Sequence, residues 1–318
     1  MKVRIKFLLA LVLTLLLILT TAGPVLADAP GSVDYVAMGD SGAAGVRAML
    51  GQLPGWEEGS DYGYTDFIAN WLALHGVLRK FNEDYSISGN TAAELAVMTS
   101  SKKAQRTLKK AEIVTLTIGA NDVLAPLYAY YDACAAGEAE LTIEGALEAI
   151  AKIQANILAG GGIVMKENFK TVLANTLNAN PDAKIYVMGY YNPLPFLVDF
   201  GYDAAPYVML LNDLINLAIS ETMVANPAAS IDYIDTLGII NGINSYSGAF
   251  PVYTYSYDYG HAYPYGPLYN YPYLPFGYKY LYVNLFEPIA DIHLTMRGYL
   301  KVAEAFITEI NADFGFAP

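Results

Sequence analysis

A serine follows a short apolar segment near the amino-terminal end of the chain. The segment VDYVAM (33–38) is rich in Val and aromatic residues, as a buried strand is, and Gly39-Asp40-Ser41 come directly after it. Ligands of open α/β sheets bind beyond the carboxyl ends of the strands, so Ser41 stands where a nucleophile would be useful. By itself, such a triplet usually marks no more than a helix N-cap after a turn.

Two further segments end in small and polar residues. DYSIS (84–88) is followed by Gly89, and IVTLTI (113–118) is followed by Gly119-Ala120-Asn121-Asp122. The side-chain amide of Asn121 can donate a hydrogen bond to an oxyanion, although a turn or cap role would explain it equally simply. Three such loops on one rim of a sheet indicate a site assembled from several strand ends.

A serine hydroxyl becomes a good nucleophile when a base takes its proton, and the chain offers only three histidines for that role. His75 lies within the apolar helical pattern WLALHGVL and is expected to pack or to face solvent. His261 lies in a tyrosine-rich segment, where binding is the more natural role. We therefore predict His293 as the general base, with Asp291 as a candidate for the group that orients its ring.

The elements that must position these residues alternate between strands and helices, which predicts an α/β fold: a three-layer doubly wound sheet of about five parallel strands with helices on both faces, of flavodoxin-like type. The expected strands cover residues 33–38, 84–88, 113–118, 183–188 and 230–235. The expected helical stretches cover residues 64–80, 91–110, 142–178, 205–225 and 295–312, with a break at the glycines 160–162.

The order of these motifs resembles that of the SGNH or GDSL hydrolases. The four namesake residues would be Ser41, Gly89, Asn121 and His293, and the segments 63–72 and 180–193 also look like parts of this family. The resemblance implies that Ser41 attacks an acyl carbon and that His293 moves the proton. It also implies an oxyanion hole built from the N–H groups of Ser41 and Gly89 and the amide of Asn121.

One departure concerns the residue that orients the base. The family usually has an aspartate three residues before the histidine, but Ala290 stands there, and Asp291 is two residues before His293. Either Asp291 or a backbone carbonyl would then hold the imidazole. Leu294 also replaces a proline that is common in the family, which changes the expected local turn but not the base.

The amino-terminal segment has the layout of a secretory signal peptide. Three cations precede a long apolar run, and small residues follow it near Ala27, so we expect residues 1–27 to be removed and the protein to be secreted. Retention as a membrane anchor is the alternative. The remaining residues, 28–318, are expected to form a single hydrolase domain. Cys134 is the only cysteine, so no disulfide can form within the chain.

A net charge of −13 disfavours binding to nucleic acid and to anionic lipid. No pattern typical of a metal or cofactor site is present, so we expect neither. The preferred function is hydrolysis of carboxylic esters through an acyl-serine intermediate. The expected substrates are short acyl esters, acetylated glycans or lysophospholipids, with a setting outside the cell or at its envelope.

A segment rich in Tyr, Pro and Gly at about 243–285 holds nearly half of the 27 tyrosines. It would be either a cap with an aromatic platform for substrate, with Tyr257, Tyr259 and His261 as candidate contacts, or an insertion that packs on its own domain. Two alternative functions follow. The protein would be a cell-surface binding protein that presents this segment on a hydrolase fold, or an acyltransferase.

Overall fold

The computed structural model describes residues 31–46, 62–140, 142–193, 202–241, 293–294 and 296–316. All elements below belong to the compact unit that begins at Val33. Its strands are β1 (Val33–Gly39), β2 (Leu78–Ser86), β3 (Ile113–Thr117), β4 (Lys184–Met188) and β5 (Ser230–Ile234). The expected signal peptide and the tyrosine-rich segment fall outside the described residues.

The five strands form one sheet in the order β2-β1-β3-β4-β5, and each neighbouring pair is parallel. This is the flavodoxin-like order, in which the direction of winding switches between β1 and β3. A switch point of this kind leaves a crevice beyond the carboxyl ends of the two strands. The structure therefore confirms the expected doubly wound α/β fold and marks the ends of β1 and β3 as the place to look for a site.

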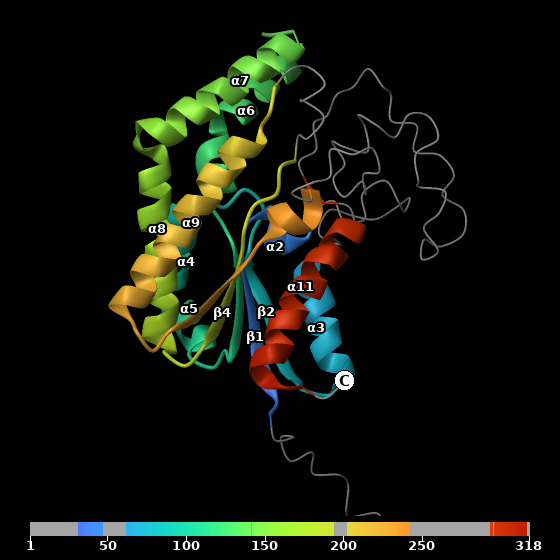
Figure 1. Ribbon diagram of the computed structural model, residues 1–318, viewed down its shortest axis with the longest axis vertical. Helices are drawn as coiled ribbons and strands as arrows, with labels where there is room; N and C mark the ends of the chain where they lie inside the picture. Colours follow the sequence, from blue (N-terminus) through green and yellow to red (C-terminus); the bar gives the residue numbers. More distant parts are fainter. Residues whose placement is uncertain are drawn as a thin grey trace, which may run out of the picture. The chain divides into compact units, whose positions relative to one another are not determined.

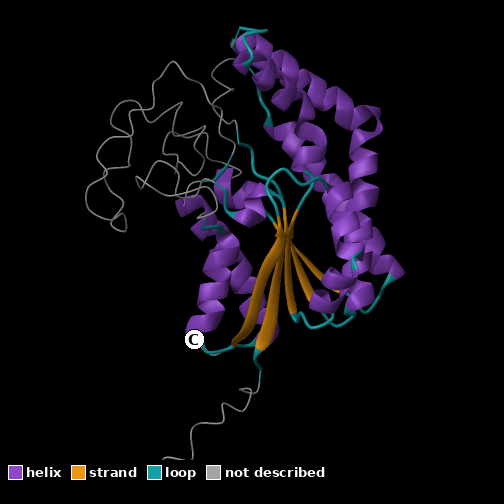
Figure 2. Ribbon diagram, turned by 180° about the vertical axis from the view of Figure 1, so that it is seen from behind, coloured by secondary structure: helices purple, strands orange, loops and turns teal. Residues whose placement is uncertain are grey.

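Helices cover both faces of the sheet (Figures 1 and 2). One face carries α3 (Tyr64–Leu74) and α11 (Met296–Phe314), and the four-residue helix α2 (Ser41–Ala44) lies beyond the end of β1. The helices on the opposite side of the sheet are α4 (Ala92–Ser100), α5 (Lys102–Leu108), α6 (Ala120–Ala135), α7 (Ile143–Asn156), α8 (Gly162–Ala179) and α9 (Ala205–Ala225). Two short π-helical segments are η1 (Ile157–Gly161) and η3 (Leu237–Asn241).

The alternation of side chains along each strand divides the apolar core into two layers. In β1, Val36 and Met38 point into the layer under α4 and α8, whereas Tyr35 and Ala37 point into the layer under α3 and α11. β1 and β3 are buried along their whole length, and most of their residues are apolar.

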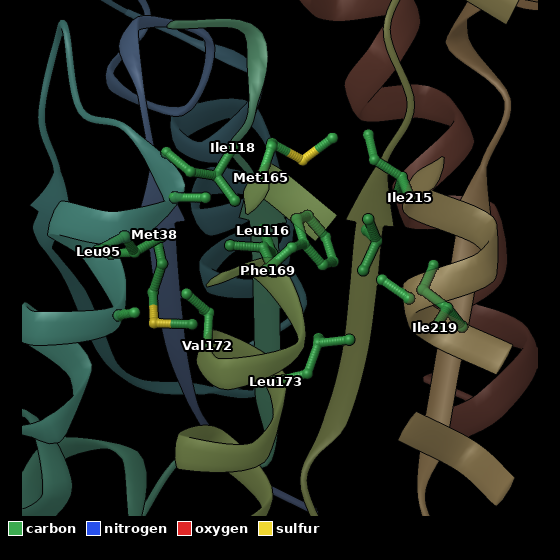
Figure 3. Packing of buried hydrophobic residues seen from close by; sticks show 14 of the residues in the cluster. Met38, Leu95, Leu116, Ile118, Met165, Phe169, Val172, Leu173, Ile215 and Ile219 are labelled. Atoms are coloured by element: carbon green, nitrogen blue, oxygen red, sulfur yellow. The ribbon is translucent and has the colours of Figure 1, made fainter. Parts of the chain in front are cut away.

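Helix α8 fills the centre of the larger layer. Phe169 of α8 is fully buried and packs among Leu116 of β3, Val172 and Met165, while Ile215 and Ile219 of α9 close the layer at its side (Figure 3). The glycine break in the long helical stretch is also confirmed, because η1 separates α7 from α8 and Gly160 has a φ of 113°. The break lets α7 and α8 follow different directions (Figure 1).

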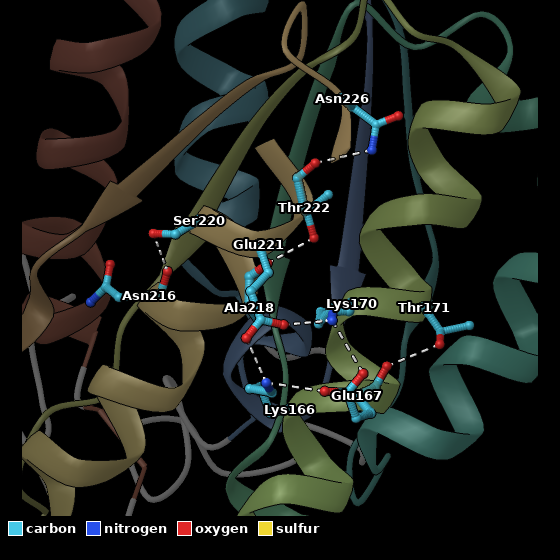
Figure 4. A network of polar contacts seen from close by, with 10 residues as sticks. All are labelled: Lys166, Glu167, Lys170, Thr171, Asn216, Ala218, Ser220, Glu221, Thr222 and Asn226. Atoms are coloured by element: carbon cyan, nitrogen blue, oxygen red, sulfur yellow. Dashed lines mark hydrogen bonds and ion pairs between the residues drawn. The ribbon is translucent and has the colours of Figure 1, made fainter. Parts of the chain in front are cut away.

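Two ion pairs join α8 to α9. Glu221 of α9 accepts hydrogen bonds from Lys166 Nζ (2.8 Å) and Lys170 Nζ (2.5 Å) of α8, and Glu167 pairs with the same two lysines (Figure 4). Ion pairs near the surface add little stability individually, so this network mainly fixes how the two helices lie against each other.

Several expected boundaries were wrong. Strand β2 begins at Leu78 rather than at residue 84, and α3 ends at Leu74 rather than at residue 80. β2 is an edge strand with half-exposed charged residues, so its pattern does not resemble a buried strand. The stretch 91–110 is two helices, since Ser101 ends α4 and caps α5. Helix α6 was missed because it begins in the polar loop and contains Pro126.

We predict that Phe169→Ala lowers the free energy of unfolding by about 3 to 5 kcal/mol, because it leaves a cavity in a core that is closed on all sides. Urea titration followed by circular dichroism measures this change. Val164→Ala, on the exposed side of the same helix, serves as the control and should shift stability by no more than about 0.5 kcal/mol. Equal losses in the two variants would contradict the described packing of α8.

Candidate active site

The site is built where β1 and β3 end side by side. Gly39 has a φ of 149°, and a Cβ atom on it would collide with the carbonyl oxygen of Thr117, so only glycine permits the two strand ends to approach this closely. Asp40 N–H donates to that same Thr117 carbonyl at 2.9 Å, and Ile87 N–H donates to Gly39 O at 3.0 Å. The loops after β1, β2 and β3 are therefore joined at a single residue.

Ser41 begins helix α2, and Asp40 is its N-cap. The Oδ1 atom of Asp40 accepts a hydrogen bond from Gly42 N–H at 2.9 Å, so the carboxyl group reaches across Ser41 and fixes the turn. The helix N-cap that the isolated triplet suggested is thus present. It does not exclude a catalytic role, because the capping side chain belongs to Asp40 and the Ser41 side chain is half-buried at the sheet edge.

Asn121 lies at the start of α6, beyond the carboxyl end of β3. Its Nδ2 donates to the carbonyl oxygen of Asn90 at 2.8 Å, and its Oδ1 accepts from Tyr128 O–H at 3.0 Å. These two contacts fix which way the amide faces, and the second N–H on Nδ2 is the one that can donate to a ligand. Because Asn90 follows Gly89 directly, the same bond sets the place of Gly89 relative to Asn121.

Asp122 braces the neighbouring loop. Its Oδ2 accepts from Ala92 N–H, the first residue of α4, at 2.8 Å, and Thr91 and Glu94 complete a capping box there. Burial raises the pKa of Asp122, an effect that its backbone hydrogen bonds partly oppose. Asp122 therefore holds α4 against α6 and keeps the loop that contains Gly89 in place.

Asp40 is a buried carboxyl group with a second partner. Its Oδ2 accepts from Tyr190 O–H at 2.8 Å, and the Tyr190 hydroxyl oxygen accepts in turn from Ala120 N–H at 2.9 Å. Burial raises the pKa of Asp40 to about 6, while the hydrogen bonds from Tyr190 and Gly42 and the nearby His293 lower the pKa. Nearby Asp122 raises it further.

His293 precedes α11, and its imidazole is half-buried. His293 also lowers the pKa of the Asp40 carboxyl group electrostatically. The Tyr299 hydroxyl of α11 donates a hydrogen bond to the carbonyl oxygen of Val46, and the N–H of Val46 donates one to the carbonyl oxygen of Ser41. Helix α11 is thus joined to the turn that carries Ser41.

His75 lies at the other end of the sheet. It follows α3, its Nδ1 is 2.7 Å from Trp71 O, and Val77 two residues later pairs with Val33 at the amino end of β1. His75 therefore lies away from Ser41, and of the two histidines among the described residues His293 is the one that precedes the helix joined to the Ser41 turn. Asp291, Tyr257, Tyr259 and His261 lie outside the described residues, so their predicted roles stay predictions.

In the structure, Ser41, Gly89 and Asn121 follow the carboxyl ends of β1, β2 and β3, and His293 precedes the helix that is joined to the Ser41 turn. The structure also adds residues that the sequence reasoning missed. Tyr190 follows β4 in the segment MGYYNP, where its place after a strand was the only available signal. Tyr128 lies about two turns after Asn121 on α6, and nothing in the sequence pattern pointed to it. Among the described residues, no group of three His, Cys, Asp or Glu side chains could hold a metal ion.

Comparison with known proteins agrees with this geometry. A model of the GDSL-like Lipase/Acylhydrolase family matches residues 37–300, which is most of the chain, so the protein belongs to that family. It is therefore a serine esterase by family, an enzyme that hydrolyses ester bonds. The family resemblance seen in the sequence is confirmed.

Two solved structures show the same fold. A lipase from a goat rumen metagenome is 17% identical with a TM-score of 0.50, and the match covers 87% of this chain and 97% of that one. An extracellular lipase from Streptomyces rimosus is 18% identical with a TM-score of 0.50, and the match covers 88% and 99% of the two chains. No curated protein matches the sequence.

We predict that the buried carboxyl group of Asp40 makes stability fall as pH rises. Its folded pKa of about 6 is above the ordinary value of 3.8, so the folded state binds the proton more tightly than the unfolded chain. Between pH 3.8 and 6 the wild type should lose about 2 kcal/mol of unfolding free energy that Asp40→Asn does not lose. Urea titrations at several pH values in this range measure the difference.

Asp84→Asn is the control for this prediction. The hydrogen bond from Lys103 lowers the pKa of the exposed Asp84, so its contribution should have the opposite sign and be small. If wild type and Asp40→Asn lost stability in parallel over this range, the raised pKa of Asp40 would be refuted.

Proposed function

We propose that this protein is a secreted serine esterase in which Ser41 is the nucleophile and His293 is the general base. The observation that carries the proposal is the anchored amide of Asn121. It is held by Asn90 and Tyr128 at the carboxyl ends of the strands, where the Ser41 turn also lies, and this supports a role as an oxyanion donor. A nucleophile, a base and a donor from three separate parts of the chain are the set that acyl transfer needs.

In this mechanism Ser41 Oγ forms a bond to the acyl carbon of the ester while His293 takes the hydroxyl proton. The negative charge moves to the former carbonyl oxygen, which accepts hydrogen bonds from the N–H groups of Ser41 and Gly89 and from Nδ2 of Asn121. Collapse of this intermediate breaks the bond to the alcohol, which takes the proton from His293. A water molecule, deprotonated by His293, then hydrolyses the acyl-serine and restores both residues.

The group that orients His293 is part of the same proposal. Asp291, or a backbone carbonyl, would accept a hydrogen bond from the imidazole and keep its other nitrogen facing Ser41. Asp291 stands one position away from its usual place in the family, which is why a backbone carbonyl is the alternative.

We propose short acyl esters, acetylated glycans or lysophospholipids as the substrates. The tyrosines at about 243–285 favour a sugar or an aromatic ester, since both stack on aromatic rings. The signal-peptide pattern of residues 1–27 supports action outside the cell, as does the fold shared with an extracellular lipase.

Replacement of the nucleophile tests the proposal directly. Ser41→Ala should lower kcat/KM for p-nitrophenyl acetate and butyrate by about 10³-fold or more, because no covalent intermediate can form. Ser101→Ala removes the N-cap serine of α5 and should leave turnover near the wild-type rate. Wild-type turnover that persists in Ser41→Ala would show that another group is the nucleophile.

Replacement of the oxyanion donor makes a separate prediction. Asn121→Ala should lower kcat by about 10²- to 10³-fold with little change in KM, because the amide acts mainly on the charge that develops in the transition state. Asn180→Ala is the matched control, since Asn180 Nδ2 also donates to a backbone carbonyl, that of Ala111, but near the amino ends of the strands. Steady-state kinetics of both variants decide the point, and similar losses in the two would mean that Asn121 acts only through stability.

A further inference from the structure

Tyr190 joins two loops that are far apart in the sequence. Its hydroxyl donates to Asp40, which is 150 positions away, and accepts from Ala120 N–H, which is 70 positions away. Asp40 comes directly before Ser41, and Ala120 comes directly before Asn121. A single oxygen atom therefore links the backbone of the proposed nucleophile to that of the proposed oxyanion donor.

The direction of both hydrogen bonds is fixed. Ala120 N–H can only donate, so the phenol oxygen accepts from it and uses its own proton toward Asp40. Burial and the adjacent Asp40 raise the pKa of Tyr190 well above its ordinary value, so the phenol keeps that proton at the pH of any plausible assay. The link cannot reverse or dissociate by ionisation of the tyrosine.

The main chain of Tyr190 is held just as firmly. Tyr190 N–H donates to Asn212 Oδ1 at 2.7 Å, and Asn212 Nδ2 donates to Tyr190 O at 2.8 Å. Asn212 is a buried residue of α9, the helix that Glu221 ties to α8. The tyrosine is thus part of a rigid support that extends from the helix layer to the site, which a residue with a purely local packing role would not need.

We propose that Tyr190 is a positioning residue for ester hydrolysis, whose hydroxyl sets the separation between the Ser41 turn and the Asn121 loop. This inference rests on the roles proposed above for Ser41 and Asn121. An oxyanion hole works only when its donors are in place before the charge develops, and small displacements of a donor cost rate. Loss of the hydroxyl should therefore affect kcat more than KM.

A second consequence concerns the pH dependence of the reaction. Three titratable groups change the pKa of Asp40: Tyr190 after β4, His293 before α11 and Asp122 on α6. Asp40 in turn raises the pKa of Tyr64 on α3. Among the hydrogen bonds and charges that lower the pKa of Asp40, the bond from Tyr190 has the largest effect. Its removal should raise the pKa of Asp40, so the carboxyl group next to Ser41 would lose its negative charge at a higher pH.

Tyr186 of β4, the strand that Tyr190 follows, offers a matched comparison. Its hydroxyl also donates to a carboxylate, Asp313 Oδ2, at 2.7 Å, but that acceptor lies on α11 near its carboxyl end, away from Ser41. Tyr186→Phe and Tyr190→Phe therefore remove the same chemical group and the same kind of hydrogen bond. Only Tyr190→Phe breaks a contact with the loops of the site.

The experiment measures kcat, KM and the pH profile of kcat/KM with p-nitrophenyl acetate for wild type, Tyr190→Phe, Tyr186→Phe and Ser41→Ala. We expect Tyr190→Phe to lower kcat about tenfold with KM nearly unchanged, and to move the acidic limb of the profile upward by about half a pH unit or more. Tyr186→Phe should keep the wild-type kcat and profile. Thermal unfolding of each variant shows how much stability the lost hydroxyl contributes.

The outcomes separate the two proposals. If Ser41→Ala is inactive but Tyr190→Phe behaves like Tyr186→Phe, the positioning role is wrong and the proposed function stands. If Ser41→Ala remains active, the proposed function itself fails. Should Tyr190→Phe not fold, Asn212→Ala, which keeps the phenol but frees its backbone, must show a smaller fall in kcat of the same kind, and an unchanged kcat there would overturn the inference.

Discussion

The close approach of β1 and β3 at Gly39 is the constraint on which the site depends. The carbonyl oxygen of Thr117 occupies the place where a side chain on residue 39 would begin, and Asp40 N–H binds that oxygen. The carbonyl of Gly39 accepts from Ile87 N–H on the other side. Each proposed oxyanion donor follows one of these three strand ends within a few residues, so the spacing of the donors is set by hydrogen bonds of the sheet itself rather than by flexible loops.

A buried carboxyl group completes this arrangement at a cost in stability. Asp40 loses its hydration, which is unfavourable for the ionised form, and only Gly42 N–H, Tyr190 O–H and the nearby His293 offset that loss. A neutral residue would cap α2 with less penalty, but it would not offer a carboxylate to both Gly42 N–H and Tyr190 O–H. Asp40 therefore gives up stability while it holds the Ser41 turn against Tyr190.

The sequence predicts the fold well because burial on both faces leaves a strong pattern. β1 and β3 are buried and mostly apolar, and the residues that follow them could be placed on one rim from the topology rules alone. The edge strand β2 was misplaced because its exposed charged residues hide the pattern. Tyr190 and Asn212 could not be predicted, since their hydrogen bonds join residues that are distant along the chain and no fixed spacing relates them.

The two helix layers contribute different parts of the chemistry. The Ser41 turn belongs to the layer of α3 and α11, where Thr65 O–H donates to Ala43 O, Tyr299 O–H donates to Val46 O and His293 precedes α11. Asn121 and its supports belong to the layer of α4, α6, α8 and α9. Two hydrogen bonds of Asp40 join these halves: its N–H donates to Thr117 O in the sheet, and its carboxyl group accepts from Tyr190 O–H. If Ser41 and Asn121 act as proposed, they must be held to a fraction of an ångström, and a bond between the layers at this point should then influence rate more than a bond of equal strength within either layer.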